Sequence, residues 1–104
     1  MVKLDKLNRI HIPKRFLLFS KIPLESKMGL FFKDEELYID SLSNATKKNP
    51  CLSIIRLDKY NNFFASQLVR KQLGIFPGSY ITVYLKDGKI TLSKQKGQLW
   101  KVVK

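Results

Sequence analysis

The stretch Leu4-Asp5-Lys6-Leu7-Asn8 recurs 53 residues later as Leu57-Asp58-Lys59-Tyr60-Asn61. The same shift aligns residues 4–40 with residues 57–93 without a gap, and eight of the 37 aligned positions are identical. Self-similarity at a fixed spacing indicates two copies of one supersecondary unit. The chain therefore consists of two related halves.

The end of each half shows apolar residues at every second position, as in a strand with one buried face. The first of these strands in each half carries Met28, Leu30 and Phe32, aligned with Ile81, Val83 and Leu85. The second carries Leu37 and Ile39, aligned with Ile90 and Leu92. Asp87-Gly88 between the later pair is a strong hairpin signal, so each half is predicted to end in a β-hairpin.

The front of each half is predicted to form another hairpin, followed by a short helix. Its strands are expected at 2–5 and 9–12, and at 53–57 and 62–65, with Asn8 and Asn61 in the turns. Ser66 is the expected N-cap of the second helix and Gly74 its stop, with Leu68, Val69 and Leu73 as the apolar stripe. Pro13 should open the first helix, Phe16, Leu17 and Phe19 should supply its stripe, and Ile22-Pro23 should end it. Pro77-Gly78 is a further turn pair.

Each half thus reads β-β-α-β-β, and a unit of about 40 residues is too small to bury a stable core alone. We expect a single domain over 1–104, mostly β with short helices and internal pseudo-two-fold symmetry. Its parts are repeat one at 1–40, a polar linker at 41–52, repeat two at 53–93 and a basic tail at 94–104. Trp100 is an expected apolar anchor of the tail, acting as a strap or a partner contact.

Charge favours a polyanionic partner. The 104 residues hold 20 Lys and Arg against 8 Asp and Glu, a formal net charge of +12. Residues 54–104 carry +8 of that excess. The mutual repulsion of these cations is relieved when the protein binds a polyanion. The longest apolar runs, Phe16–Phe19 and Met28–Phe32, are too short for a bilayer span or a signal peptide, so no membrane partner is expected.

Further motifs carry a family resemblance. Residues 4–13 resemble the opening of the AbrB/MazE/SpoVT swapped-hairpin superfamily, a pattern of roughly D-x-x-G-R-hydrophobic-x-hydrophobic-P. Leu73-Gly74-Ile75, Pro77-Gly78-Ser79 and the hairpin at 83–92 resemble the rest of that pattern. The resemblance implies two interleaved β-β-α-β-β repeats forming one small β-barrel, here from one chain as in the tandem MraZ-like arrangement. It also implies DNA binding, as a transcriptional regulator or an antitoxin.

The resemblance places the DNA-binding residues beside the turns and helices. The family's arginine after the turn matches Arg9, whereas the second half has Asn62 there. The family's basic pair in the helix matches Arg70 and Lys71, where the first half has Leu17 and Leu18. Cations near these positions can also contact phosphates, and one amide side chain can recognise the edge of an adenine. The full expected DNA-binding set is Arg9, Lys14, Arg15, Lys59, Gln67, Arg70 and Lys71.

The expected function is sequence-specific binding of double-stranded DNA by a transcriptional regulator in the cytoplasm, at the nucleoid, with a homodimer as a further expectation. Two alternatives stay open: an antitoxin that neutralises a toxin protein, and a protein that binds structured RNA. No enzyme, cofactor or metal is predicted, because Cys51 and His11 are the single cysteine and histidine, and Asp34-Glu35-Glu36 reads as an exposed turn.

Stacking on nucleic-acid bases would need several exposed aromatic residues on one sheet face. Core positions are the default for those inside predicted elements, which are Phe16, Phe19, Phe31, Phe32, Phe63 and Phe64. Phe31 and Tyr84 have the opposite parity from the buried set, so a surface position is the alternative for these two.

Overall fold

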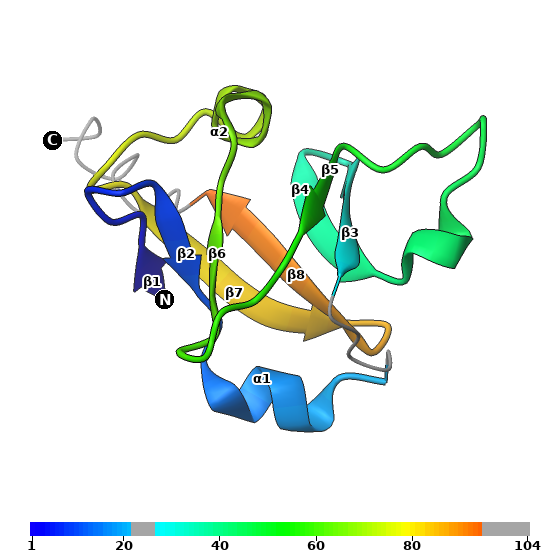
Figure 1. The fold of residues 1–104 in the computed structure, drawn as a ribbon, viewed down its shortest axis with the longest axis horizontal. Helices are drawn as coiled ribbons and strands as arrows, with labels where there is room; N and C mark the ends of the chain where they lie inside the picture. Colours follow the sequence, from blue (N-terminus) through cyan, green and yellow to red (C-terminus); the bar gives the residue numbers. More distant parts are fainter. Residues whose placement is uncertain (22–26, 95–104) are drawn as a thin grey trace, which may run out of the picture.

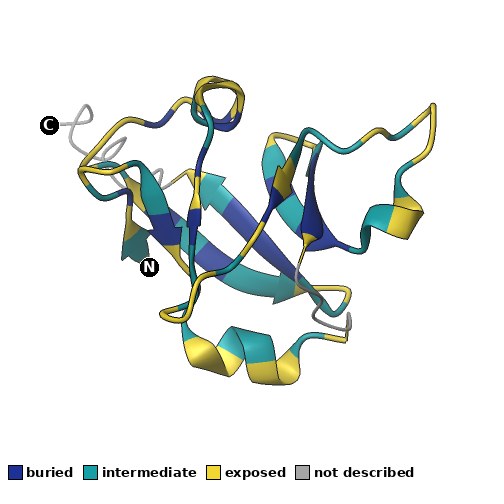
Figure 2. Ribbon diagram, in the orientation of Figure 1, coloured by how far each residue is buried: buried dark blue, intermediate teal, exposed yellow. Residues whose placement is uncertain are grey.

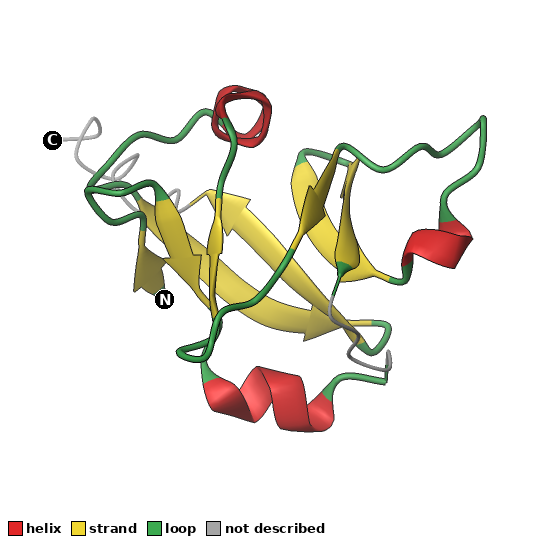
Figure 3. Cartoon of the chain, viewed as in Figure 1, coloured by secondary structure: helices red, strands yellow, loops and turns green. Residues whose placement is uncertain are grey.

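The computed structural model describes residues 1–21 and 27–94 (Figure 1). A curved six-stranded antiparallel sheet in the order β1-β7-β8-β4-β3-β5 forms a half-barrel, and β2 and β6 form a separate two-stranded sheet, the ribbon (Figure 3). The strands are β1 Val2–Lys3, β2 Arg9–His11, β3 Met28–Lys33, β4 Glu36–Asp40, β5 Ser53–Ile55, β6 Asn62–Phe64, β7 Tyr80–Lys86 and β8 Lys89–Lys94. The helices are α1 Lys14–Phe19, η1 Leu42–Asn44 and α2 Gln67–Leu73. No helix among these residues is long and apolar enough to cross a membrane.

Four of the strand pairs join the two halves of the chain. β1 pairs with β7, β5 with β3, β2 with β6 and β4 with β8, always across the halves. The register repeats with the 53-residue shift, since Val2 lies opposite Ile81 and Ile55 lies opposite Met28. Each half therefore completes its hydrogen bonding with strands of the other half.

The hairpins predicted at the front of each half are wrong in their pairing, although their turns form. The Asn8 amide donates to the Asp5 carbonyl at 3.0 Å, and the Asn61 amide donates to the Asp58 carbonyl at 3.0 Å. Beyond each turn the two strands diverge, because the first joins the large sheet and the second joins the ribbon. Local turn chemistry therefore determines where the chain reverses direction. It does not determine which strands pair with each other.

The hairpins predicted at the end of each half are confirmed. β3 pairs with β4 and β7 with β8, each across a two-residue turn. The turn residues Asp34, Glu35, Asp87 and Gly88 all have positive φ, as the favoured hairpin turns require. Asn8 and Asn61 also have positive φ, at 60° and 65°, so the left-handed conformation expected of them is confirmed.

The helices confirm the expected caps but not all of the expected apolar stripes. Ser66 caps α2 by accepting from the Val69 amide, and Gly74 ends it in the left-handed conformation. Val69 and Leu73 are buried, while Leu68 is exposed because it lies a quarter-turn away from them. α1 begins directly after Pro13 and ends at Phe19, so the end predicted at Ile22-Pro23, which lies outside the described residues, is not where the helix stops. Phe16 and Leu17 are half-buried.

The core draws on both halves, and two of the aromatic expectations are wrong (Figure 2). Phe19 and Phe64 are exposed, at 70% and 58%, rather than in the core. Phe31 takes the core position rather than the surface alternative, since it is fully buried and stacks on Tyr38 with ring centroids 5.2 Å apart. Tyr84 is half-buried.

The linker explains the burial of Phe31. The Leu52 amide donates to the Leu30 carbonyl at 2.7 Å, and the Asn49 side chain donates to the Tyr38 hydroxyl at 2.9 Å. Buried Asp40 anchors the linker's start by accepting from Asn44 and pairing with Lys89 at 3.2 Å. The linker thereby covers the face of β3 and β4 that simple alternation assigns to solvent. Trp100 and the tail beyond Lys94 lie outside the described residues.

Candidate nucleic-acid interface

The turns that precede β2 and β6 are each stabilised by an aspartate in the same way. Asp5 accepts from the backbone amides of Leu7 and Arg9, at 2.9 Å and 2.7 Å. Asp58 accepts from the amides of Tyr60 and Asn62, two and four residues later in the same way. Aspartate side chains that bond the backbone two residues on stabilise such turns. The repeated Leu-Asp-Lys-x-Asn stretch is thus a turn-forming motif in both halves.

Arg9 distinguishes the first turn from the second. Its Nε donates to Asp5 Oδ2 at 2.8 Å, which orients the guanidinium while leaving the side chain 42% exposed. Within the described residues, its two terminal amino groups have no other hydrogen-bond partner. A guanidinium held this way is oriented to offer two parallel donors to a base or a phosphate.

The turn carboxylates are held in their charged form. Desolvation alone would raise the pKa of Asp5, but hydrogen bonds from Arg9 and Leu7, with the Arg9 charge, outweigh it and lower that pKa. The pKa of Asp58 is lowered chiefly by the hydrogen bond from the Asn62 backbone, against slight desolvation, and further by Tyr60 and the Arg9 charge. Both acids near the ribbon are therefore engaged within their own turns.

The first corner of the ribbon brings together the first turn and α2. The Ala65 amide donates to the Asn8 carbonyl at 2.8 Å, which fixes the start of α2 beside the turn. Arg70 folds back along the helix, and its Nε donates to the Ala65 carbonyl at 3.0 Å. Gln67 is exposed in the first turn of α2. The expected residues Arg9, Gln67 and Arg70 thus belong to one corner.

The second corner is the counterpart formed by the second turn and α1. The Ile12 amide donates to the Asn61 carbonyl at 2.8 Å, which fixes the start of α1 beside that turn. Lys14 and Arg15 are exposed in the first turn of α1, and the Arg15 guanidinium lies 4.7 Å from the centre of the Phe16 ring. Lys59 Nζ lies 5.1 Å from the centre of the Tyr60 ring. Three more expected residues thus share this corner.

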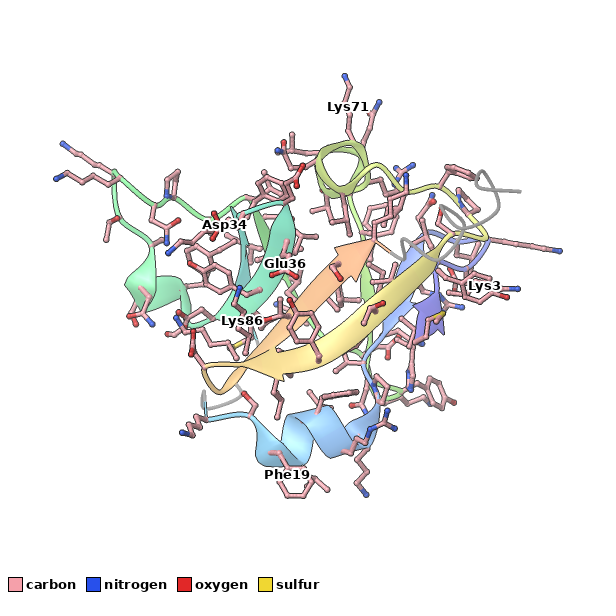
Figure 4. All side chains as sticks on the ribbon, turned by 180° about the vertical axis from the view of Figure 1, so that it is seen from behind. Lys3, Phe19, Asp34, Glu36, Lys71 and Lys86 are labelled. Atoms are coloured by element: carbon pink, nitrogen blue, oxygen red, sulfur yellow. The ribbon has the colours of Figure 1, made fainter. Side chains whose placement is uncertain are left out.

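Lys71 is not brought to either corner. It points outward from α2, away from the sheet (Figure 4). Its position in the last turn of a helix also suits a cation, because the carbonyl end carries partial negative charge. The structure therefore divides the seven expected residues into a group of three, a second group of three, and Lys71.

The ribbon joins the corners, lying in front of β7 and β8 with α2 above and α1 below in Figure 1. Ile10 and Phe63 point into the core, at 0% and 1% exposure. The alternating positions form the ribbon's outer face, which consists of Arg9, His11, Asn62 and Phe64. His11 Nδ1 and Asn62 Oδ1 are 3.0 Å apart across it. Sequence reasoning missed Phe64 here, although its alignment with polar His11 signalled an outer position.

Charge is distributed unevenly between this region and the rest of the molecule. Residues 1–21 and 53–74, which hold the ribbon, both corners and both helices, contain ten basic and two acidic side chains. The other described residues contain seven basic and five acidic side chains. Some of these other cations are paired with acids. Lys86 pairs with Glu36 at 3.4 Å on the side of the sheet seen from behind (Figure 4).

Comparison of the chain with protein-family models, with curated proteins and with solved structures found no match. The candidate interface therefore stands on the geometry and charge of this chain.

Proposed function

We propose that this protein binds double-stranded DNA sequence-specifically and regulates transcription, as an AbrB-like swapped-hairpin barrel whose two copies belong to one chain. The cross-half pairing of β1 with β7 and of β5 with β3 supports the interleaved arrangement. Because the two copies differ at Arg9 and Asn62, the DNA-binding face is asymmetric, and a chain acting alone prefers a non-palindromic site.

One observation carries the proposal: ten basic and two acidic side chains occupy the segments that build the ribbon and its corners. Both of those acids, Asp5 and Asp58, are engaged in turns. Such a surface attracts phosphates, and a two-stranded β-ribbon is one of the elements that the DNA major groove admits.

Selection from a random duplex library at about 0.15 M salt tests the proposal, because nonspecific attraction is screened beyond roughly 8 Å under these conditions. We expect a recovered motif. Arg9→Ala and Arg70→Ala should each weaken binding to that motif by about 1–3 kcal/mol if they contact bases. Lys47→Ala with Lys48→Ala, in the exposed linker, is the charge-matched control.

Three results would count against the proposal, and a fourth would count against its site residues. Recovery of DNA without a motif would indicate an architectural protein that binds DNA nonspecifically. Preference for structured RNA over duplex DNA would favour RNA binding, and capture of neither would favour the antitoxin alternative. Unchanged affinity of a folded Arg9→Ala/Arg70→Ala double variant would remove both side chains from the interface.

A further inference from the structure

Phe64 is the one large apolar side chain on the outer face of the ribbon, and it is 58% exposed at the end of β6, where its backbone pairs with that of Arg9. Its neighbour Phe63 is 1% exposed and supplies the core contact of β6. Packing therefore accounts for Phe63 but not for Phe64.

The counterpart of Phe64 in the first half shows that folding does not require an apolar residue there. Shifted by 53 residues, Phe64 corresponds to His11, which is also exposed on the outer face. One copy thus carries a polar ring and the other an apolar ring at the same place in the strand pair. The segments around Phe64 are strongly basic, so a partner attracted by that charge would meet an apolar ring at this place.

Phe64 lies directly opposite Arg9 in the register of the ribbon. Directly opposed side chains on one face have Cβ atoms about 4.5–5.5 Å apart. In the DNA major groove, arginine recognises the acceptors of guanine, and phenylalanine contacts the C5-methyl group of thymine. The Arg9–Phe64 pair therefore presents two complementary reading groups side by side.

We infer that Phe64 contacts the methyl group of a thymine within one or two base pairs of a guanine bound by Arg9. This inference rests on the proposed function and specifies the base contacts of that same surface. The occupant is duplex DNA rather than another protein, because the surrounding segments hold ten cations and only two acids, both engaged within turns.

The test replaces each thymine of the selected duplex in turn by deoxyuridine, which lacks only the methyl group. We expect one position at which this change weakens binding of the wild-type chain by about fourfold, the effect of one buried methyl group. Phe64→Ala should weaken binding to the unmodified site and abolish the difference between thymine and deoxyuridine at that position. Phe64→His, which copies the residue of the first half, is the second variant.

Several outcomes overturn the inference while leaving DNA binding intact. These are a selected site without thymine, a site at which no thymine is sensitive to deoxyuridine, or a Phe64→Ala variant that keeps the full sensitivity. Sedimentation completes the test: a wild-type dimer that Phe64→Ala dissociates would assign this ring to an interface between two copies. Absence of duplex binding by the wild-type chain would instead overturn the proposed function and this inference together.

Discussion

Ile10 of β2 lies directly opposite Phe63 of β6, the residue that occupies the same place in the second copy 53 positions later. Tyr38 and Thr91 are related in the same way where β4 meets β8. Residues that pair with their own counterparts mark where the two copies exchange strands. The ribbon and the centre of the large sheet therefore join equivalent strands of the two copies, whereas the β1–β7 and β3–β5 pairs join non-equivalent strands.

The ribbon's inner side should control stability, and its outer side should not. Phe63→Ala should lower the free energy of unfolding by about 3–5 kcal/mol, because it removes a fully buried ring. Phe64→Ala should change it by less than about 0.5 kcal/mol, because that ring is exposed. Urea unfolding of both variants measures the difference, and the milder Phe63→Leu serves if Phe63→Ala does not fold. Equal losses from Phe63→Ala and Phe64→Ala would contradict the orientation of β6.

Sequence periodicity and turn chemistry could predict this fold up to the choice of strand partners. Turn and cap residues act through their neighbours in the chain, and the structure has each in its expected role. These residues are Asn8, Ser66, Gly74 and Asp87-Gly88. Pairing of β2 with β6 depends on contacts over 50 residues apart, which local patterns do not encode. Neighbouring side chains in a strand point to opposite faces, so a core position as the default for aromatic residues is right for Phe63 and wrong for Phe64.

Phe31 shows a different limit of sequence reasoning. Alternation correctly places it on the other side of β3 from Leu30, but that side is covered by the linker rather than by solvent. The sequence predicts the candidate DNA-binding site only in part for the same reason. Arg9, Lys14, Arg15 and Arg70 could be selected by residue type and family resemblance. Their division between two corners follows from the Asn8–Ala65 and Asn61–Ile12 hydrogen bonds, which only the tertiary structure provides.

The two β-hairpin turns offer a matched pair of substitutions. Glu35 has φ of 65° and its counterpart Gly88 has φ of 78°. A side chain in this region is strained by about 1–2 kcal/mol, whereas glycine is not. Glu35→Gly should therefore raise the free energy of unfolding by about 1 kcal/mol. Gly88→Ala should lower it by at least as much, because the new Cβ would also meet the Lys21 side chain, 2.6 Å from Lys21 Cδ. Thermal unfolding of the two variants would show shifts of the same sign if the turns were not of this type.

Acid stability should depend on Asp5. Its pKa is lowered in the folded protein, because hydrogen bonds from Arg9 and Leu7 and the Arg9 charge outweigh desolvation. The stability this gives is fully present above the ordinary pKa of 3.8 and is lost as pH falls through the lower folded value. Asp5→Asn should flatten the fall of the urea midpoint below about pH 4. Carboxyl NMR of Arg9→Met should show the Asp5 pKa higher than in the wild type; an unchanged value would remove Arg9 as a cause.

Alkaline stability should depend on Tyr84. Desolvation, the hydrogen bond to Glu36 and the Glu36 charge raise the pKa of Tyr84 from 10.0 to about 12. The neutral phenol therefore contributes stability that is fully present below pH 10.0 and is lost as pH rises toward about 12. The Tyr84→Phe variant should lose less stability than the wild type over that interval. Absorbance titration of phenolate follows the group directly, and Glu36→Gln should bring the Tyr84 pKa down. A wild-type titration without a phase above that of an ordinary tyrosine would contradict the prediction.

The second corner should supply affinity without sequence information. Lys14, Arg15 and Lys59 surround the start of α1, and sequence is read by contacts to base edges rather than to phosphates. If each neutralises one phosphate, replacing all three by Gln should reduce the slope of log affinity against log salt by about 3, since each contact contributes about 0.9. The selected motif should stay the same, because Arg9 and Phe64 are untouched. The Lys47→Ala/Lys48→Ala variant should keep the wild-type slope, since those lysines lie in the linker. A changed motif with an unchanged slope would mean that the second corner reads bases, and the two corners would then have exchanged the roles assigned to them.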